Sequence, residues 1–150
     1  MSEAKRVESI DEVKGFLAKI KYLFSLKFFS LRIQYERLTD NMRNVVFTNR
    51  YTIATLFPDE DPVAALKNEV KTLSISEYMH TMKDSRFPGN TDFRVFGRKY
   101  DNHPDHVYIK LRVEIIPPKT NSPQNNVYII SFHFSDHSLT DTDFPYLKAE

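Results

Sequence analysis

The clearest pattern in the sequence is an alternation of apolar and polar residues between His106 and Ile116. Because successive side chains of a β-strand point to opposite faces, this segment is predicted to be a strand with one apolar and one polar face. The apolar positions are Val107, Ile109, Leu111, Val113 and Ile115, and the polar ones are His106, Tyr108, Lys110, Arg112 and Glu114. The strand therefore presents cations, a tyrosine and a histidine to one side of its sheet.

Two further apolar runs, Phe93–Phe96 and Val127–His133, are predicted to be strands of the same sheet. The loop between residues 116 and 126 is rich in Pro, Asn and Ser, which favour a reversal of the chain. We therefore expect Val127–His133 to pair antiparallel with His106–Ile116.

The pairing register follows from counting back from that loop. It places His133 opposite Tyr108, and Ser131 opposite Lys110. Residues opposite one another in a pair of strands share a face, so the polar face is predicted to gather Tyr108, Lys110 and His133. The run Phe93–Phe96 is expected to add Arg94 to it.

Two segments within about residues 9–73 have the spacing of amphipathic helices. Ser9 and Glu12 form a capping-box pattern at the start of the first, and Asp61 followed by Pro62 is typical of a helix start in the second. Their apolar positions are Ile10, Val13, Phe16, Leu17, Ile20, Leu23 and Phe24, and then Val63, Leu66, Val70 and Leu73. We expect both helices to pack on the sheet. Because the polar face of the first is basic, a helix lying on a membrane surface is the alternative.

Shorter patterns complete the predicted fold. Phe29–Tyr35 alternates like a strand, although a continued helix is the alternative, and Val45–Phe47 is predicted to be a second short strand. Tyr51–Leu56 is expected to form helical turns that end before a proline, and Ser76–Thr81 to lead towards the sheet. The fold class predicted is α+β, with N-terminal helices packed on an antiparallel sheet.

The composition bounds the classes of protein to consider. A chain of 150 residues without repeats or linkers is expected to form a single domain spanning residues 1–150. The absence of cysteine excludes disulfides and thiolate metal sites. No apolar leader or membrane-spanning run is present in the sequence, so we expect a cytoplasmic protein without a membrane partner.

Charge is distributed unevenly along the chain, although the net charge is only +1. Residues 1–50 carry ten Lys or Arg against six Asp or Glu, and residues 80–133 carry eight against five. Residues 51–79 carry two against five, and residues 134–150 one against four. This distribution indicates a locally positive surface and counts against a uniformly basic nucleic-acid-binding protein.

A set of short motifs follows in order from about Glu69 to Tyr146: L-S-I-S-E-Y, R-x-P-G, F-R-V-F-G-R, V-Y-I-K-L, I-S-F-H and F-P-Y. Each motif alone is common, but their order and spacing resemble the MqsR-like family of type II toxin–antitoxin toxins. The resemblance implies a RelE-like fold and sequence-preferring cleavage of single-stranded mRNA without a metal or other cofactor. It also implies neutralisation by, and assembly with, an antitoxin protein.

The matched motif positions imply four catalytic residues, which are His80, Arg94, Tyr108 and His133. Metal-independent RNA cleavage needs a base for the 2′-OH proton, an acid for the leaving 5′-oxygen, and cations for the charge on phosphorus. Histidine suits both proton roles, since its ordinary pKa is about 6.5. We expect His133 and His80 to share them, Arg94 and Lys110 to hold phosphate, and Tyr108 to orient or donate.

Substrate binding is assigned to four cations of the same region, Lys110, Arg98, Lys99 and Arg112. Each candidate also has an ordinary structural interpretation. A histidine at a strand end is commonly a surface residue, Tyr108 fits a packing position, and Lys110 and Arg112 fit a solvated strand face. Arg98 and Lys99 fit a turn.

Two other classes of protein stay open. His103, Asp105 and His106, or His133 and His137 with Asp136, offer nitrogen and oxygen ligands for a metal-dependent hydrolase, although neither spacing lies on a recognisable helix. A non-catalytic interaction module of the same fold would have the same sequence pattern. Sensitivity of cleavage to a chelator separates the first class, and a tight partner without cleavage indicates the second.

Overall fold

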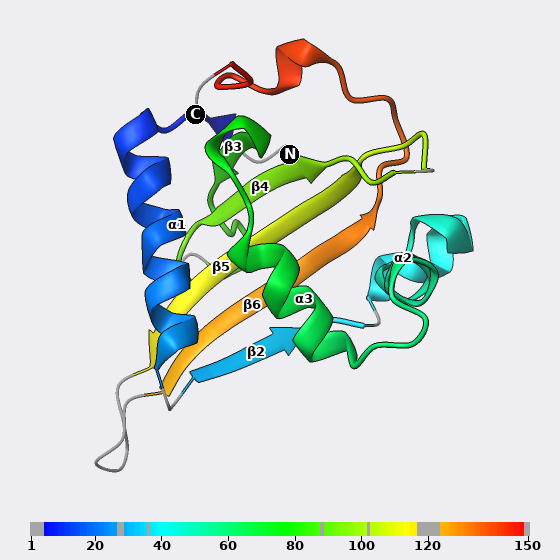
Figure 1. The fold of residues 1–150 in the computed structure, drawn as a ribbon, viewed down its shortest axis with the longest axis horizontal. Coiled ribbons are helices and arrows are strands. Elements are labelled where there is room, and N and C mark those ends of the chain that lie inside the picture. Colours follow the sequence, from blue (N-terminus) through cyan, green and yellow to red (C-terminus); the bar gives the residue numbers. More distant parts are fainter. Residues whose placement is uncertain are drawn as a thin grey trace.

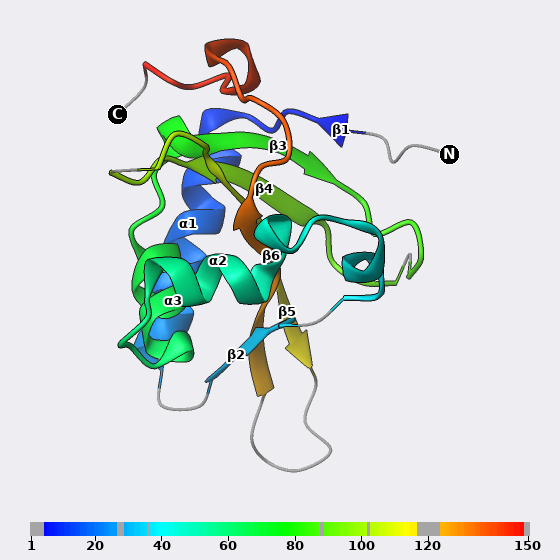
Figure 2. The same ribbon diagram turned by 90° about the vertical axis from the view of Figure 1, so that its right-hand side faces the viewer.

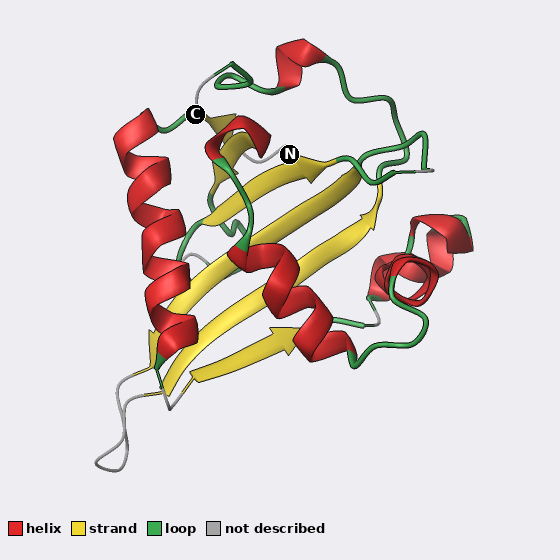
Figure 3. Ribbon diagram, viewed as in Figure 1, coloured by secondary structure: helices red, strands yellow, loops and turns green. Residues whose placement is uncertain are grey.

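Three α-helices, six β-strands and four short 3₁₀ helices make up the described part of the chain (Figures 1 and 3). The computed structural model describes residues 5–26, 29–35, 37–87, 89–101, 103–116 and 124–148. The α-helices are α1 (Ile10–Ser25), α2 (Asn49–Leu56) and α3 (Pro62–Lys71). The strands are β1 (Lys5–Arg6), β2 (Phe29–Ile33), β3 (Tyr78–Met82), β4 (Phe93–Arg98), β5 (Val107–Ile116) and β6 (Gln124–Phe134). The 3₁₀ helices are η1 (Leu38–Met42), η2 (Val45–Phe47), η3 (Ile75–Glu77) and η4 (Asp141–Asp143).

The six strands form one sheet in the order β1-β3-β4-β5-β6-β2. Neighbouring strands run antiparallel except at one edge, where β2 runs parallel to β6. The predicted α+β class is confirmed, and the sheet is antiparallel as predicted except at that edge. The chain enters β2 from α1 and not through a hairpin with its neighbour, so no tight turn forces the antiparallel direction.

The predicted helix starts are confirmed. Ser9 Oγ accepts a hydrogen bond from Glu12 N at 3.2 Å, and Glu12 Oε1 accepts one from Ser9 N at 3.2 Å, which completes the capping box of α1. Asp61 Oδ2 accepts from Ala64 N at 3.0 Å at the start of α3. Each cap satisfies backbone N–H groups that would otherwise have no partner within the helix.

Helices α1 and α3 cover one face of the sheet, while the loop between β3 and β4 lies on the opposite side (Figure 2). The core between these helices and the sheet contains the apolar stripe of α1 and the apolar face of β5, including Val107, Ile109 and Leu111, each 0% exposed. Because the stripe of α1 is buried here, the alternative of a membrane-surface helix is wrong. Val63 departs from the predicted stripe of α3, since it is 42% exposed in the first turn. None of the described helices combines the length and the apolar character needed to cross a membrane.

Most of the shorter predicted elements are present. Phe29–Tyr35 contains β2, and Ser76–Thr81 enters the sheet itself as β3. Val45–Phe47 is not a strand but the 3₁₀ helix η2. There Asn44 Oδ1 accepts a hydrogen bond from Val46 N at 3.1 Å, a local cap that competes with extended pairing.

A β-bulge in β6 sets the direction of its side chains. Lys110 pairs with Ser131 but Leu111 pairs with Ile129, so Ile130 is an extra residue in β6. The bulge shifts the alternation by one position, and the apolar side chains before and after it both reach the helix-covered core. These are Val127, Ile129, Phe132 and Phe134. The same shift turns Ser131 and His133 to the other face.

Helix α2 replaces a neighbouring strand beside the second half of β6. Asn49 Nδ2 donates to the carbonyl oxygens of Gln34 and Ile130 at 2.6 and 2.9 Å, and its Oδ1 accepts from Phe132 N at 2.9 Å. Thr52 Oγ1 accepts from Phe134 N at 3.0 Å. Asn49 and Thr52 are 1% and 0% exposed, so they satisfy backbone groups that water does not reach.

The C-terminal tail packs on the second face of the sheet through Phe144, in a smaller apolar cluster with Met79, Val95 and other residues of β3 and β4. Gly97 in β4 allows this approach, because a Cβ there would lie 2.9 Å from the Phe144 ring. The tail therefore covers only part of this face, and the remainder is the site described next.

Candidate functional site

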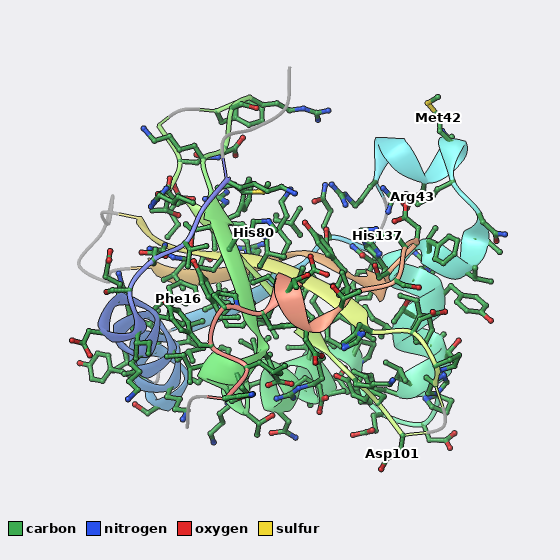
Figure 4. The ribbon with its side chains drawn as sticks, turned by 90° about the horizontal axis from the view of Figure 1, so that it is seen from above. Phe16, Met42, Arg43, His80, Asp101 and His137 are labelled. Atoms are coloured by element: carbon green, nitrogen blue, oxygen red, sulfur yellow. The ribbon has the colours of Figure 1, made fainter. Side chains whose placement is uncertain are left out.

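The face of the sheet away from α1 and α3 contains a cavity of about 510 Å³. It is lined by side chains from β5 and β6, from β1 and β3, from the chain around η1 and η2, and from the tail. They include Tyr108, Lys110, His133, His80, Arg37 and Arg43. In Figure 4, the labelled His80, Arg43 and His137 come from three separate segments that converge on this face. We call this cavity the groove.

The predicted register is confirmed in the centre of the groove. Tyr108 pairs with His133, and Lys110 pairs with Ser131. The rings of Tyr108 and His133 are stacked, with centroids 5.4 Å apart and planes at 24°. Lys110 Nζ lies 4.6 Å from the centre of the Phe93 ring on the same face. The sequence thus predicted which central residues meet, while their roles stay a prediction.

The hydrogen bonds of His133 define its protonation. Its Nδ1 lies 2.9 Å from the carbonyl oxygen of Phe134, which can only accept, so Nδ1 carries the proton. In the neutral ring Nε2 then holds a lone pair, 3.4 Å from Arg43 Nη1. Burial lowers the pKa of His133, Phe134 O opposes this, and Arg43 and Arg37 lower the pKa further. His133 is therefore neutral at pH 7 and equipped to accept a proton.

His80 lies in the same groove on β3, but it is not the protonated complement of His133. Burial, reinforced by Lys5 and Lys110, lowers the pKa of His80 to about 4. Its Nε2 is buried and has no hydrogen-bond partner within the described structure. Both of these imidazoles are neutral at pH 7, so the proton for a leaving group has to come from another side chain.

The low pKa of His80 makes stability depend on pH. Its folded pKa of about 4 lies below the ordinary 6.5, so the unfolded chain binds the proton first as the pH falls. We expect the free energy of unfolding to fall between about pH 6.5 and pH 4, and to fall less in His80→Asn. Urea unfolding of both proteins at pH 7 and about pH 5 measures this difference. An equal loss in both would show that His80 does not cause it.

Arg37 and Arg43 are groove residues that the sequence patterns did not predict. Arg37 Nη1 donates to Ser131 Oγ at 3.0 Å, and Arg43 Nη1 donates to Phe47 O at 3.3 Å. Burial and then the charge of Arg43 lower the pKa of Arg37. No carboxylate of the described ranges forms an ion pair with either guanidinium. Two neighbouring arginines of this kind favour an anionic ligand.

Arg94 does not join the groove, and the prediction that it shares this face is wrong. It pairs with Leu111 and points to the helix-covered side. Its Nε and Nη2 donate to the Glu8 carboxylate at 2.8 and 3.1 Å, and its guanidinium lies 4.7 Å from the Phe16 ring centre. In β4 the alternate residues Phe93 and Val95 face the groove side and pack with the tail, which leaves Arg94 on the other face.

The other predicted binding cations divide into two groups. Arg98 donates to Glu77 at 2.7 Å and to the carbonyl oxygens of Glu69 and Thr72 at the end of α3, so it fixes this helix and lies outside the groove. Lys99 is exposed just after β4 and does not line the groove. Arg112 lies on the groove side, paired with Glu114 at 2.6 Å. Lys110 and Arg112 are therefore placed to contact a ligand, and Arg98 and Lys99 are not.

The histidines proposed as metal ligands are dispersed. The His103 ring packs on Phe134 and the His106 ring on Phe144, with centroids 5.3 and 5.5 Å apart. His137 is exposed, with its Nδ1 2.9 Å from Asp136 Oδ1. Across the described residues, no group of three or more His, Asp or Glu side chains is arranged to hold a metal ion. The geometry therefore gives the metal-dependent class no ligand cluster in this part of the chain.

No protein-family model, curated protein or solved structure matches the chain. The resemblance to the MqsR-like toxins rests on the quoted motifs and stays a prediction. What the groove does has to be inferred from its own residues.

Proposed function

We propose that this protein is a metal-independent endoribonuclease that cleaves single-stranded mRNA, acting as the toxin of a type II toxin–antitoxin system. Helices on one face of a largely antiparallel sheet, with a cationic groove on the other, are compatible with the RelE-like fold that the motifs imply. One observation carries the proposal: a buried, neutral His133 directs its Nε2 lone pair into a groove beside Arg37 and Arg43.

The chemistry follows from these positions. His133 Nε2 takes the proton of a ribose 2′-OH, and the 2′-oxygen forms a bond to the adjacent phosphorus. Arg37, Arg43 and Lys110 hold the negative charge that develops on the phosphoryl oxygens. The bond to the 5′-oxygen breaks, leaving a 2′,3′-cyclic phosphate and a 5′-OH. His137 is exposed and also lines the groove, and we assign to it the proton for the leaving oxygen.

Cleavage of a single-stranded RNA in EDTA tests this proposal. We expect cleavage to persist in EDTA, to give cyclic phosphate ends, and to stop when the ribose at the cleavage position is 2′-deoxy, because the attacking hydroxyl is then missing. Loss of cleavage in EDTA with recovery on adding a divalent metal would contradict the proposal and restore the metal-dependent class. RNA binding without cleavage would instead indicate the non-catalytic module, which the low pKa of His80 favours, because a neutral His80 cannot serve as the acid.

The proposed toxin requires a protein that blocks it, since unrestrained mRNA cleavage stops growth. Arg37 and Arg43 line the groove, and the acidic side chains of such an antitoxin would compete with RNA for them. Co-expression with the product of the adjacent gene tests this part. Two soluble proteins that do not form a complex would count against the toxin role and not against RNA cleavage itself.

A further inference from the structure

A second hollow of about 430 Å³ adjoins the groove and shares Arg37 and Lys110 with it. Its lining adds two more arginines, Arg86 from the loop between β3 and β4 and Arg112 from β5. Arg112 lies over Tyr128, with its guanidinium carbon 4.3 Å from the ring centre. A ligand that spans both hollows would therefore meet cations in each of them, although Asp136 and Asp143 also line the groove. Cations spaced in this way suit the phosphate backbone of a nucleic acid.

Phe87 stands at the rim of this second hollow and is 63% exposed. Its loop is held in place by Asp84, which is only 8% exposed. Asp84 Oδ1 accepts from the backbone N–H groups of Arg86 and Phe87 at 3.2 Å each, and Oδ2 accepts from Asn90 Nδ2 at 3.1 Å. A single exposed phenylalanine is ordinary on a protein surface. This one combines a backbone held by Asp84, a position on the groove side of the sheet, and cations in the lining of the same hollow.

An aromatic ring beside a row of cations matches the two parts of a single-stranded nucleic acid. Phosphates bind the cations, and any base has a flat face that stacks on the ring. We propose that the second hollow is a nucleotide subsite in which Phe87 stacks on a base next to the scissile phosphate, while Arg86 and Arg112 contact the backbone. This inference rests on the proposed RNA cleavage and specifies where the substrate continues beyond His133.

The chain contains no tryptophan, so one introduced residue can report on this position alone. In Phe87→Trp we expect the fluorescence to be quenched, in a saturable way, by a 2′-O-methyl oligoribonucleotide in EDTA, which binds without being cleaved. The matched control is Tyr22→Trp on α1, since Tyr22 is also 63% exposed but lies away from the groove. Inorganic polyphosphate, which has charge but no bases, should bind and leave the fluorescence of Phe87→Trp unchanged.

Substitution measures the contribution of the ring. Base stacking on an aromatic side chain predicts that Phe87→Ala weakens oligonucleotide binding by about 5–100-fold, with Phe87→Trp close to wild type and Tyr22→Ala unchanged. If the wild type cleaves RNA but Phe87→Trp reports no quenching, the subsite is wrong and the proposed function survives. Equal quenching by polyphosphate would also overturn base stacking. If the wild type neither binds nor cleaves RNA, both proposals are wrong.

Discussion

His133→Ala is expected to slow RNA cleavage by about 10²–10⁴-fold, the usual cost of losing a general base. The reason is geometric: Nδ1 donates to Phe134 O, so Nε2, which lies 3.4 Å from Arg43 Nη1, carries the lone pair that takes the 2′-OH proton. Single-turnover cleavage of a defined RNA in EDTA measures the effect. Because His133 is only 8% exposed and stacks on Tyr108, circular dichroism and thermal unfolding must accompany the rate.

His133→Gln is the matched control, because it keeps most of the volume and cannot act as a base near pH 7. It should be as slow as His133→Ala while unfolding closer to wild type. The wild-type rate should fall with acidity only below about pH 6.5, since the pKa of His133 is lowered. In Arg43→Gln this fall in rate should begin at a higher pH, because the charge of Arg43 helps to lower the pKa of His133. A folded His133→Gln that cleaves as fast as wild type would remove His133 from the chemistry.

Arg94→Ala is expected to lower the free energy of unfolding by about 3–5 kcal/mol, because it leaves a buried carboxylate without its ion pair. Glu8 is 6% exposed and also accepts from Thr81 Oγ1 at 2.6 Å. Burial raises the pKa of Glu8, but the hydrogen bonds from Arg94 and Thr81 outweigh it and lower the pKa. Glu8 therefore contributes stability above its unfolded pKa of about 4.5, and the contribution is lost as the pH falls through the lower folded pKa.

Urea unfolding at pH 7 measures the change, with Arg94→Met and Glu8→Gln/Arg94→Met as the informative pair. The double variant removes both charges and keeps the hydrogen bond to Thr81, so it should recover part of the stability that Arg94→Met loses. RNA cleavage by whatever fraction of Arg94→Met stays folded should be near wild type. If the Arg94→Ala protein were as stable as wild type but no longer cleaved RNA, Arg94 would be a catalytic residue after all.

The parts of the fold that local pattern determines were predictable. The alternation in β5 and the proline-rich loop before β6 determine which residues meet across the two strands, and Tyr108 and His133 pair as expected. The helix caps at Ser9 and Asp61 are likewise local, since each depends on residues within one turn. Local interactions of this kind can be predicted from a few neighbouring residues.

The rest depends on contacts between distant segments. Arg37 and Arg43 reach the groove because Asn49 fixes the start of α2 against β6, more than 80 residues later in the chain. The sequence also shows no sign that Arg94 belongs to the core side, because its partner Glu8 lies 86 residues away. Charge counts located a positive region along the chain, but they could not separate an arginine that binds a ligand from one that fixes the fold.

The bulge at Ile130 gives the local backbone conformation of β6 a role of its own in this site. If the same residues ran through this point in regular alternation, without the bulge, the two faces would exchange beyond Ile130. Phe132 would then enter the groove, and His133 would enter the apolar core. Asn49 holds the backbone on both sides of the extra residue, through Ile130 O and Phe132 N. The bulge therefore decides which side chains of β6 face the groove, as much as the identity of those residues does.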